Sequence, residues 1–203
     1  MALKTKASVS AGTAFELLEA DVYDAIFAGV VVRPFQVYEG KPGEMQDKYI
    51  FIYQIPMEGD AAPRYLKSSP LAITINEKSN LYAKHLKALT GKTDAELGND
   101  FDPSTLLGKQ IRLEVSQMKS KKDGKTYNEI EKAMTASKIK ITLEKGTVPE
   151  FFVKGATEYE FAPGIKTDDD GPVAGDTAAP LDMEALVSSV TDAAPRKRPA
   201  PIQ

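Results

Sequence analysis

The 203 residues carry a net charge of -3 and no cysteine, and 42% of them are hydrophobic, which is typical of a globular protein with one sizeable core. The lack of cysteine excludes disulfides, thiolate metal sites and cysteine nucleophiles. The sequence has no apolar run close to the roughly 20 residues that span a bilayer and no secretory signal, so we expect a cytoplasmic protein without membrane contact.

The N-terminal part of the chain predicts an arm followed by strands. Residues 1–14 are small and polar and are expected to form a flexible arm, after which residues 15–162 are expected to fold. A β-branched run contains Gly29, and a glycine in such a run is typical of a bulge or a sharp bend. Two short apolar segments, 64–66 and 71–75, predict one broken strand or two short ones.

Residues 48–55 form the clearest predicted strand, and its two faces differ. Isoleucines alternate there with an aromatic row, Tyr49, Phe51 and Tyr53. If the isoleucines face the core, the rings stand outside and offer stacking surfaces to unpaired bases. If the rings are core instead, the isoleucines lie beneath a helix or the C-terminal segment. The sequence leaves both interpretations open.

A short helix is predicted next, because apolar residues recur at helical spacing from Leu81 to Leu89 and Gly91 follows them. The single histidine, His85, lies at the edge of this apolar stripe, so we expect a partly buried structural residue. One histidine without cysteine offers no metal-ligand pair and no relay, and we predict no metal site, cofactor or catalytic residue. Without a phosphate-binding glycine loop or a nucleophile elbow, no enzymatic activity is expected.

The most informative stretch, 101–134, predicts a β-hairpin with a cationic tip. Two alternating segments flank Asp123-Gly124, a pair typical of the positive φ angles of a tight turn. The residues placed there to meet a polyanion are Lys119, Lys121, Lys122 and Lys125, with Arg112 on the first strand and Tyr127 after the tip. The alternative is a hairpin edge that lysine keeps soluble. A further alternating segment, 139–143, follows.

The order of these elements is three strands, a helix, and two or three strands. It is the order of the five-stranded OB barrel, which has a helix between strands 3 and 4, so we predict an all-β fold with small α content and this barrel. Another small β-rich α+β domain is the alternative, because order does not fix topology. In an OB barrel the loop between strands 4 and 5 is one wall of the binding groove, a position suited to phosphate contact.

The C-terminal part of the chain predicts a docking segment and a tail. Residues 146–162 have enough apolar mass to dock on the domain, whereas residues 163–203 are rich in proline, glycine, alanine and aspartate and are expected to be disordered. A short amphipathic helix is predicted within the tail over 181–192. Its candidates for binding a partner protein are Leu181, Leu186, Val187 and Val190.

Several short motifs resemble those of one family. They are Glu77-Lys78-Ser79-Asn80-Leu81 and Leu89-Thr90-Gly91 around the predicted helix, then Phe101-Asp102 and Leu106-Leu107-Gly108-Lys109. The stretch they define, about residues 23–136, resembles phage-encoded OB-fold single-stranded DNA-binding proteins. The resemblance implies a non-enzymatic protein that coats unpaired DNA in the cytoplasm of the infected bacterial host and contacts replication or recombination proteins. Such proteins often end in an acidic tail, and this chain departs from the pattern because residues 196–203 are basic and proline-rich.

These observations predict a sequence-tolerant single-stranded DNA-binding protein that uses lysine–phosphate contacts and aromatic stacking. The predicted DNA-binding residues are Tyr49, Phe51, Tyr53, Arg112, Lys119, Lys121, Lys122, Lys125 and Tyr127. The alternative is a protein-interaction or virion-associated β module that binds no nucleic acid. This alternative stays open because residues 1–145, with 21 basic and 19 acidic side chains, are only slightly cationic. Residues 146–203 have 5 basic and 10 acidic side chains and are anionic.

Overall fold

The computed structural model describes residues 17–37, 43–57, 59, 62–121 and 123–167, and strands dominate them. The strands are β1 (Asp21–Gln36), β2 (Met45–Ile55), β3 (Arg64–Lys67), β4 (Leu71–Ala72), β5 (Gln110–Lys119), β6 (Thr126–Met134), β7 (Gly146–Val148), β8 (Glu158–Phe161) and β9 (Ile165–Thr167). The helical elements are η1 (Tyr82–Leu86), α1 (Lys87–Thr90), α2 (Asp94–Leu97), η2 (Pro103–Leu106) and η3 (Glu150–Phe152). The predicted all-β class with small α content is confirmed. None of the helices in these ranges is long and apolar enough to cross a membrane.

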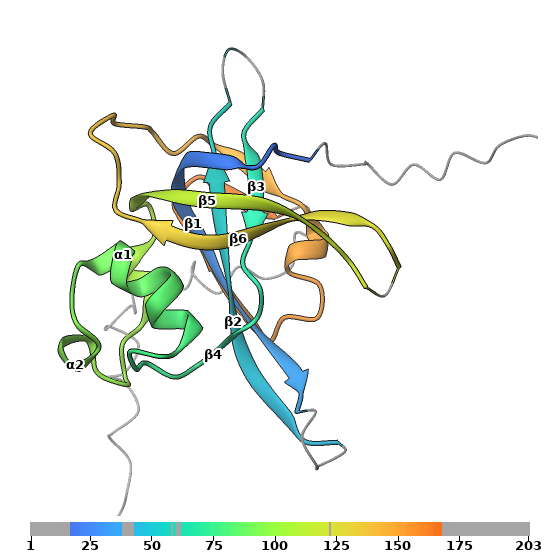
Figure 1. Cartoon of the computed structure of the whole chain (residues 1–203), viewed down its shortest axis with the longest axis vertical. Coiled ribbons are helices and arrows are strands. Elements are labelled where there is room, and N and C mark those ends of the chain that lie inside the picture. The colour runs from blue at the N-terminus through green and yellow to red at the C-terminus, as the bar shows by residue number, and fades with distance from the viewer. Residues whose placement is uncertain (1–16, 38–42, 58, 60–61, 122, 168–203) are drawn as a thin grey trace, which may run out of the picture. The chain divides into compact units, whose positions relative to one another are not determined.

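Strand β1 organises the larger sheet, because β2, β5 and β8 all pair with it in antiparallel fashion. The strand order is β3-β2-β1-β5-β6, with β4 on β2, and β7 and β9 form a separate parallel pair. The pairing of β1 with β2 shifts register between Phe27 and Gly29, where β1 passes from β5 to β8. Figure 1 shows β1 turning sharply along its length. The bulge predicted from Gly29 is therefore confirmed.

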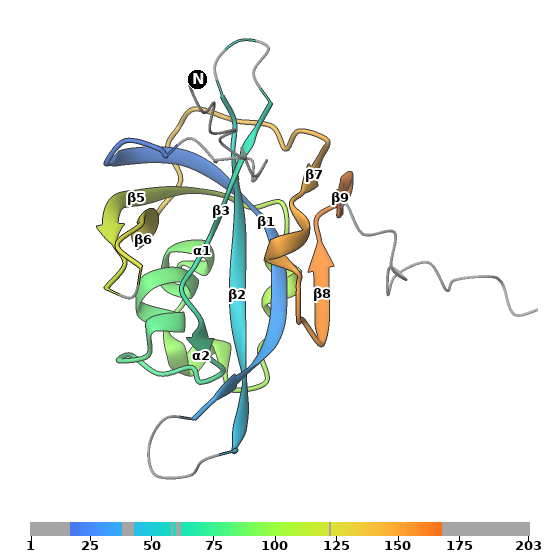
Figure 2. The same cartoon turned by 90° about the vertical axis from the view of Figure 1, so that its right-hand side faces the viewer.

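The hydrophobic core lies on both sides of β1 and β2. On one side, which faces β5, β6 and the helices, Phe27, Phe51 and Leu86 belong to what we call the inner core. On the other side, Ile50 and Ile52 pack in the outer core. The C-terminal segment, which runs from β7 to β9, supplies the rest of the outer core and lies across β1 and β2 from the helices (Figure 2).

The outer core explains why position 29 is glycine. A β-carbon built on Gly29 would lie 2.4 Å from Cδ1 of Phe161 and 3.3 Å from the Glu160 carbonyl oxygen. We expect Gly29→Ala to push β8 away from β1 and to lower the free energy of unfolding by about 1–3 kcal/mol, the usual cost of overpacking. Urea denaturation measures the loss. A double variant, Gly29→Ala with Phe161→Ala, should lose less than the two single changes together, and strict additivity would contradict this account.

The predicted helix is present but begins in an unexpected form. Residues Tyr82–Leu86 form a π-helical turn, which continues into α1 and ends at Gly91 with a left-handed φ of 70°.

The alternating segment 139–143 forms no strand. The tail was predicted to begin at Pro163, yet Ile165 is buried in the outer core within β9, so this boundary is wrong. The predicted arm, 1–14, lies outside the described residues.

The two edges of the larger sheet, β3 and β6, do not close it. No ladder joins them in the described part of the chain, and a cavity of about 240 Å³ lies between them, against Tyr65 and Asn128. Leu18 occupies this seam: its N–H donates to Oδ1 of Asn128 at 2.9 Å, and its carbonyl oxygen accepts from Nδ2 of Asn128 at 2.8 Å. The closed five-stranded barrel predicted from the element order is not seen, because Leu18 and the cavity stand where the closing ladder would form.

Candidate nucleic-acid interface

The structure separates the predicted DNA-binding residues into three places. The aromatic row lies on β2, the lysines and Tyr127 lie at the tip of the β5–β6 hairpin, and Arg112 lies at the far end of the same hairpin. Lys122 lies outside the described residues, as do the predicted partner-binding residues of the tail, Leu181, Leu186, Val187 and Val190.

Two members of the aromatic row are core residues. The side chains of Phe51 and Tyr53 are 0% exposed, and both rings pack on Phe27, with centroids 4.8 and 5.5 Å away. The prediction that Phe51 and Tyr53 offer stacking surfaces is therefore wrong, since no base can reach them without unfolding the inner core. The alternative holds instead: the rings face inward and the isoleucines of β2 lie beneath the C-terminal segment.

His85 completes this aromatic cluster. Its Nδ1 shares a hydrogen bond of 2.8 Å with the Tyr53 hydroxyl, its ring stacks on Tyr53, and it meets Phe51 edge-on. Burial, with a smaller contribution from Lys84, lowers the pKa of His85 to about 3. Burial also raises the pKa of Tyr53 well above its usual value. The pair is neutral at physiological pH and structural, and His85 is buried fully rather than partly.

Tyr49 lies at the rim of the inner core and is partly exposed. Its ring is 6.2 Å from that of Phe51, centroid to centroid. Partial burial raises the pKa of Tyr49, and the carboxylates of Asp102 and Glu158 raise it further. The surroundings of Tyr49 are thus anionic, which disfavours a phosphate beside this ring.

The hairpin tip is a wider turn than Asp-Gly predicts. Among the described residues of the tip, only Gly124 has a positive φ, of 70°. The loop closes through two backbone bonds: Ser120 N–H to the Lys125 oxygen at 2.8 Å and Gly124 N–H to the Ser120 oxygen at 2.9 Å. Asp123 accepts hydrogen bonds from Ser120 and Lys125, which lower its pKa. The described lysines of the tip are exposed, as predicted: Lys119, Lys121 and Lys125.

An apolar pair stands at the base of this tip. Tyr127 and Met118 face each other across the two strands, and the side chains are 44% and 42% exposed. Residues paired in this way point to the same face of a sheet, so the ring and the thioether form one small surface. The hairpin therefore presents an exposed aromatic ring at the base of a tip with exposed lysines, of which Lys119, paired with Thr126, points to the other face.

Arg112 lies far from this tip. It pairs with Met134, seven positions along β5 from Lys119, which corresponds to about 23 Å at the rise of a strand. Carboxylates stand between the two ends of the hairpin, on Glu114, Glu129 and Glu131. A contact that uses Arg112 is therefore separate from a contact that uses the tip.

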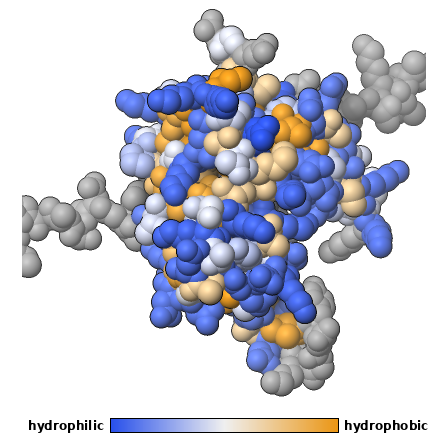
Figure 3. Space-filling model, turned by 60° about the vertical axis from the view of Figure 1, so that its left-hand side comes forward, coloured by the Kyte–Doolittle hydropathy of each residue, from blue (hydrophilic) through white to orange (hydrophobic). Residues whose placement is uncertain are grey.

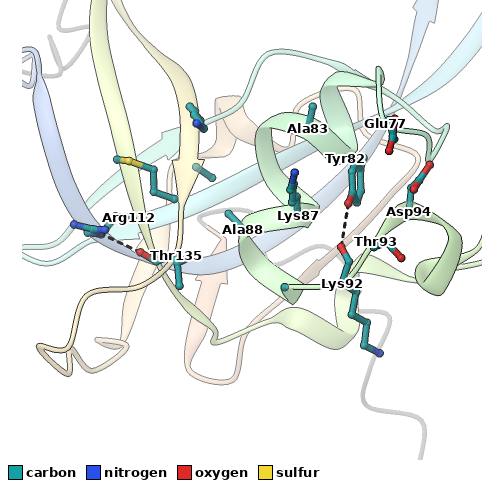
Figure 4. Close-up of a pocket in the computed structure, with 14 residues that line it drawn as sticks. Glu77, Tyr82, Ala83, Lys87, Ala88, Lys92, Thr93, Asp94, Arg112 and Thr135 are labelled. Atoms are coloured by element: carbon teal, nitrogen blue, oxygen red, sulfur yellow. Dashed lines mark hydrogen bonds between the residues drawn. The ribbon is translucent and has the colours of Figure 1, made fainter.

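Arg112 lines a groove of about 950 Å³ between the α1 helix and the β5–β6 hairpin (Figure 4). Its Nε donates to the Thr135 carbonyl oxygen at 3.0 Å, and the Tyr82 hydroxyl donates to the Lys92 carbonyl oxygen at 3.1 Å across the groove's other wall. The remaining charged residues of the groove are Lys87, Lys92, Lys132, Glu77 and Asp94. The prediction missed these three lysines, although Lys87 is recognisable as a cation opposite the apolar stripe of the helix.

On the side that carries the helices, the described residues form no extended apolar face. Figure 3 shows hydrophobic residues scattered there among hydrophilic ones. This surface does not indicate a large apolar partner interface.

Comparison with known proteins gives no relative from which a function could be transferred. No protein-family model, no curated protein and no solved structure matches this chain.

Proposed function

We propose that this chain is a sequence-tolerant single-stranded DNA-binding protein built on an OB-type barrel with an open seam. The observation that carries the proposal is the exposed Tyr127 ring beside the lysines of the hairpin tip. Lysines supply the phosphate contacts that dominate affinity for nucleic acids, and an exposed ring supplies a face on which any base can stack. A protein with these two features binds unpaired strands with little regard to sequence.

The strand order supports the OB-type assignment. Strands β1 and β2, with the two short strands β3 and β4 that both pair with β2, lead into helices and then into the β5–β6 hairpin, which returns to pair with β1. The cationic tip then corresponds to the loop between strands 4 and 5, which contacts oligonucleotides in OB folds. A role in phage DNA replication or recombination, with partner proteins at the tail, follows from the family resemblance and belongs to the same proposal.

Neutralising the tip is expected to weaken binding by charge alone. A double variant, Lys121→Gln with Lys125→Gln, removes two cations, so the slope of log affinity against log salt for oligo(dT) should flatten by about 1.4, at roughly 0.7 per phosphate contact on single strands. Fluorescence anisotropy across a salt series measures the slope. The matched control is Lys138→Gln with Lys140→Gln, because both lysines are exposed outside the hairpin.

Two outcomes would count against the proposal. An unchanged slope in the tip variant would remove the hairpin tip from the interface. If the wild-type protein failed to bind oligo(dT) at low salt, the DNA-binding function itself would be wrong, and the protein-interaction module would remain.

A further inference from the structure

The outer face of β1, β2 and β3 gathers cations beside phenylalanine rings. Its cations are Arg33, Lys48 and Lys67, and its rings are Phe35, Phe151 and Phe152. We call this set the Arg33–Lys67 face. It lies beside the C-terminal segment, to which Phe151 and Phe152 belong, on the side of β1 and β2 opposite to the helices, and contains none of the residues predicted to bind DNA.

The cations of this face lie close together. Arg33 stands directly opposite Lys48 in the β1–β2 ladder, an arrangement that destabilises a sheet through repulsion. Burial lowers the pKa of Lys67, and the charge of Arg33 lowers it further. The Arg33 Nε atom is also buried without a hydrogen-bond partner in the described residues. Each feature costs folding free energy, and an anion bound here would offset that cost.

The carboxylates of β8 point elsewhere. Glu158 and Glu160 on β8 are paired with Val32 and Val30, so their side chains project to the face of the sheet opposite to that of Arg33. The raised pKa of Tyr49, to which Glu158 contributes, agrees with this direction. The Arg33–Lys67 face is thus not neutralised by β8.

The ring of Phe151 lies at the edge of this face and packs against Phe152 and Lys67. It meets the ring of Phe152 edge-on at 4.3 Å between centroids, and the Lys67 Nζ lies 5.7 Å from the Phe151 centroid and 5.6 Å from that of Phe152. Phe152 is buried, and its carbonyl oxygen accepts a hydrogen bond of 3.0 Å from Nη2 of Arg33. Phe151 keeps 42% of its side chain exposed. A preorganised, exposed ring beside cations suits base stacking.

We infer that the Arg33–Lys67 face is a second contact for single-stranded DNA, in which Lys67 and Arg33 bind the phosphate backbone and a base stacks on Phe151. The inference rests on the proposed function and extends it to the C-terminal segment. One hydrogen bond links the chain after β3 with β6: the Ser69 hydroxyl, two residues from Lys67, donates to the carboxylate of Glu129, two residues from Tyr127, at 3.4 Å.

The absence of tryptophan from the chain allows a direct test. Three single-tryptophan variants, Phe151→Trp, Tyr127→Trp and Ile139→Trp, report stacking locally; the last is the control, because Ile139 is 68% exposed and outside both contacts. Titration with oligo(dT) at low salt is expected to quench emission severalfold more for Phe151→Trp than for Ile139→Trp. Heparin, a polyanion without bases, should displace the oligonucleotide without quenching.

The outcomes separate the inference from the proposed function. Quenching of Tyr127→Trp without quenching of Phe151→Trp overturns the inference and leaves the proposed function standing. If oligo(dT) quenches neither Tyr127→Trp nor Phe151→Trp and the anisotropy does not change, both the inference and the proposed function are overturned. If heparin and oligo(dT) quench Phe151→Trp equally, the polyanion's charge and not base stacking changes the emission. This result also overturns the inference.

The phosphate contact is tested in the same background. Lys67→Gln added to Phe151→Trp is expected to move the midpoint of quenching to severalfold higher oligo(dT), whereas Lys140→Gln added to Phe151→Trp leaves it in place. Urea denaturation of each variant confirms that the fold is kept. A midpoint that does not move with Lys67→Gln contradicts the phosphate role of Lys67.

Discussion

Replacing Phe51 with alanine is expected to lower the free energy of unfolding by about 3–5 kcal/mol, the usual cost of deleting a buried aromatic ring. The side chain is 0% exposed and contacts Phe27, Tyr49 and His85 through ring pairs, so its removal leaves a cavity that rigid neighbours cannot fill. A domain of this size has a total stability of about 5–15 kcal/mol. The variant should therefore be close to unfolded at elevated temperature. Urea denaturation followed by circular dichroism measures the loss.

Tyr49→Ala is the matched control for Phe51→Ala, because Tyr49 lies on the same face of the same strand and is partly exposed. Its loss of stability should be clearly smaller. If Phe51→Ala kept the wild-type urea midpoint and lost affinity for oligo(dT), the core assignment of the aromatic row would be wrong, and the stacking interpretation would return.

Acidification is expected to destabilise the fold through His85. The pKa of this residue is about 3 in the folded protein and 6.5 in an unfolded chain, so between these values the unfolded state binds the extra proton. The contribution to stability is complete above pH 6.5 and is lost as the pH falls toward 3. From pH 7 to pH 4.5 the loss is about 2.5 kcal/mol, at 1.36 kcal/mol per pH unit.

A variant without the titrating ring isolates this contribution from that of the carboxylates. His85→Gln keeps a polar partner for the Tyr53 hydroxyl and does not ionise, so its unfolding free energy should fall by about 2.5 kcal/mol less than that of the wild type between pH 7 and pH 4.5. Urea midpoints at both pH values provide the comparison. Parallel pH profiles for the two proteins would mean that His85 titrates in the folded state as it does in water.

Local patterns were sufficient to predict most of the strands and the helix. The alternation in β2, the bulge at Gly29 and the end of α1 at Gly91 each depend on a few neighbouring residues. The segment 139–143 shows the limit of that approach, because its alternation finds no neighbouring strand to pair with. Alternation predicts a strand only where the fold supplies a partner.

The aromatic row could not be placed from sequence because β2 is buried on both faces. Alternation identifies two faces, but it does not say which one is covered, and here the inner core takes Phe51 while the C-terminal segment takes Ile50. That segment is about a hundred residues away in sequence from β2, and no local pattern reports such a contact. The tip lysines were easier to predict, since a charged turn between two strands is exposed wherever the hairpin packs.

The pairing of β8 with β1 also has a consequence for biosynthesis. Ile50 and Ile52 emerge from the ribosome early, whereas the segment that covers them, ending in β9, is made about a hundred residues later. At roughly 5–20 residues per second this delay is about 5–20 s. During that time the apolar part of the outer face, around Ile50 and Ile52, is uncovered. A chain halted before β8 would expose this surface and be prone to aggregation, even with its inner core complete.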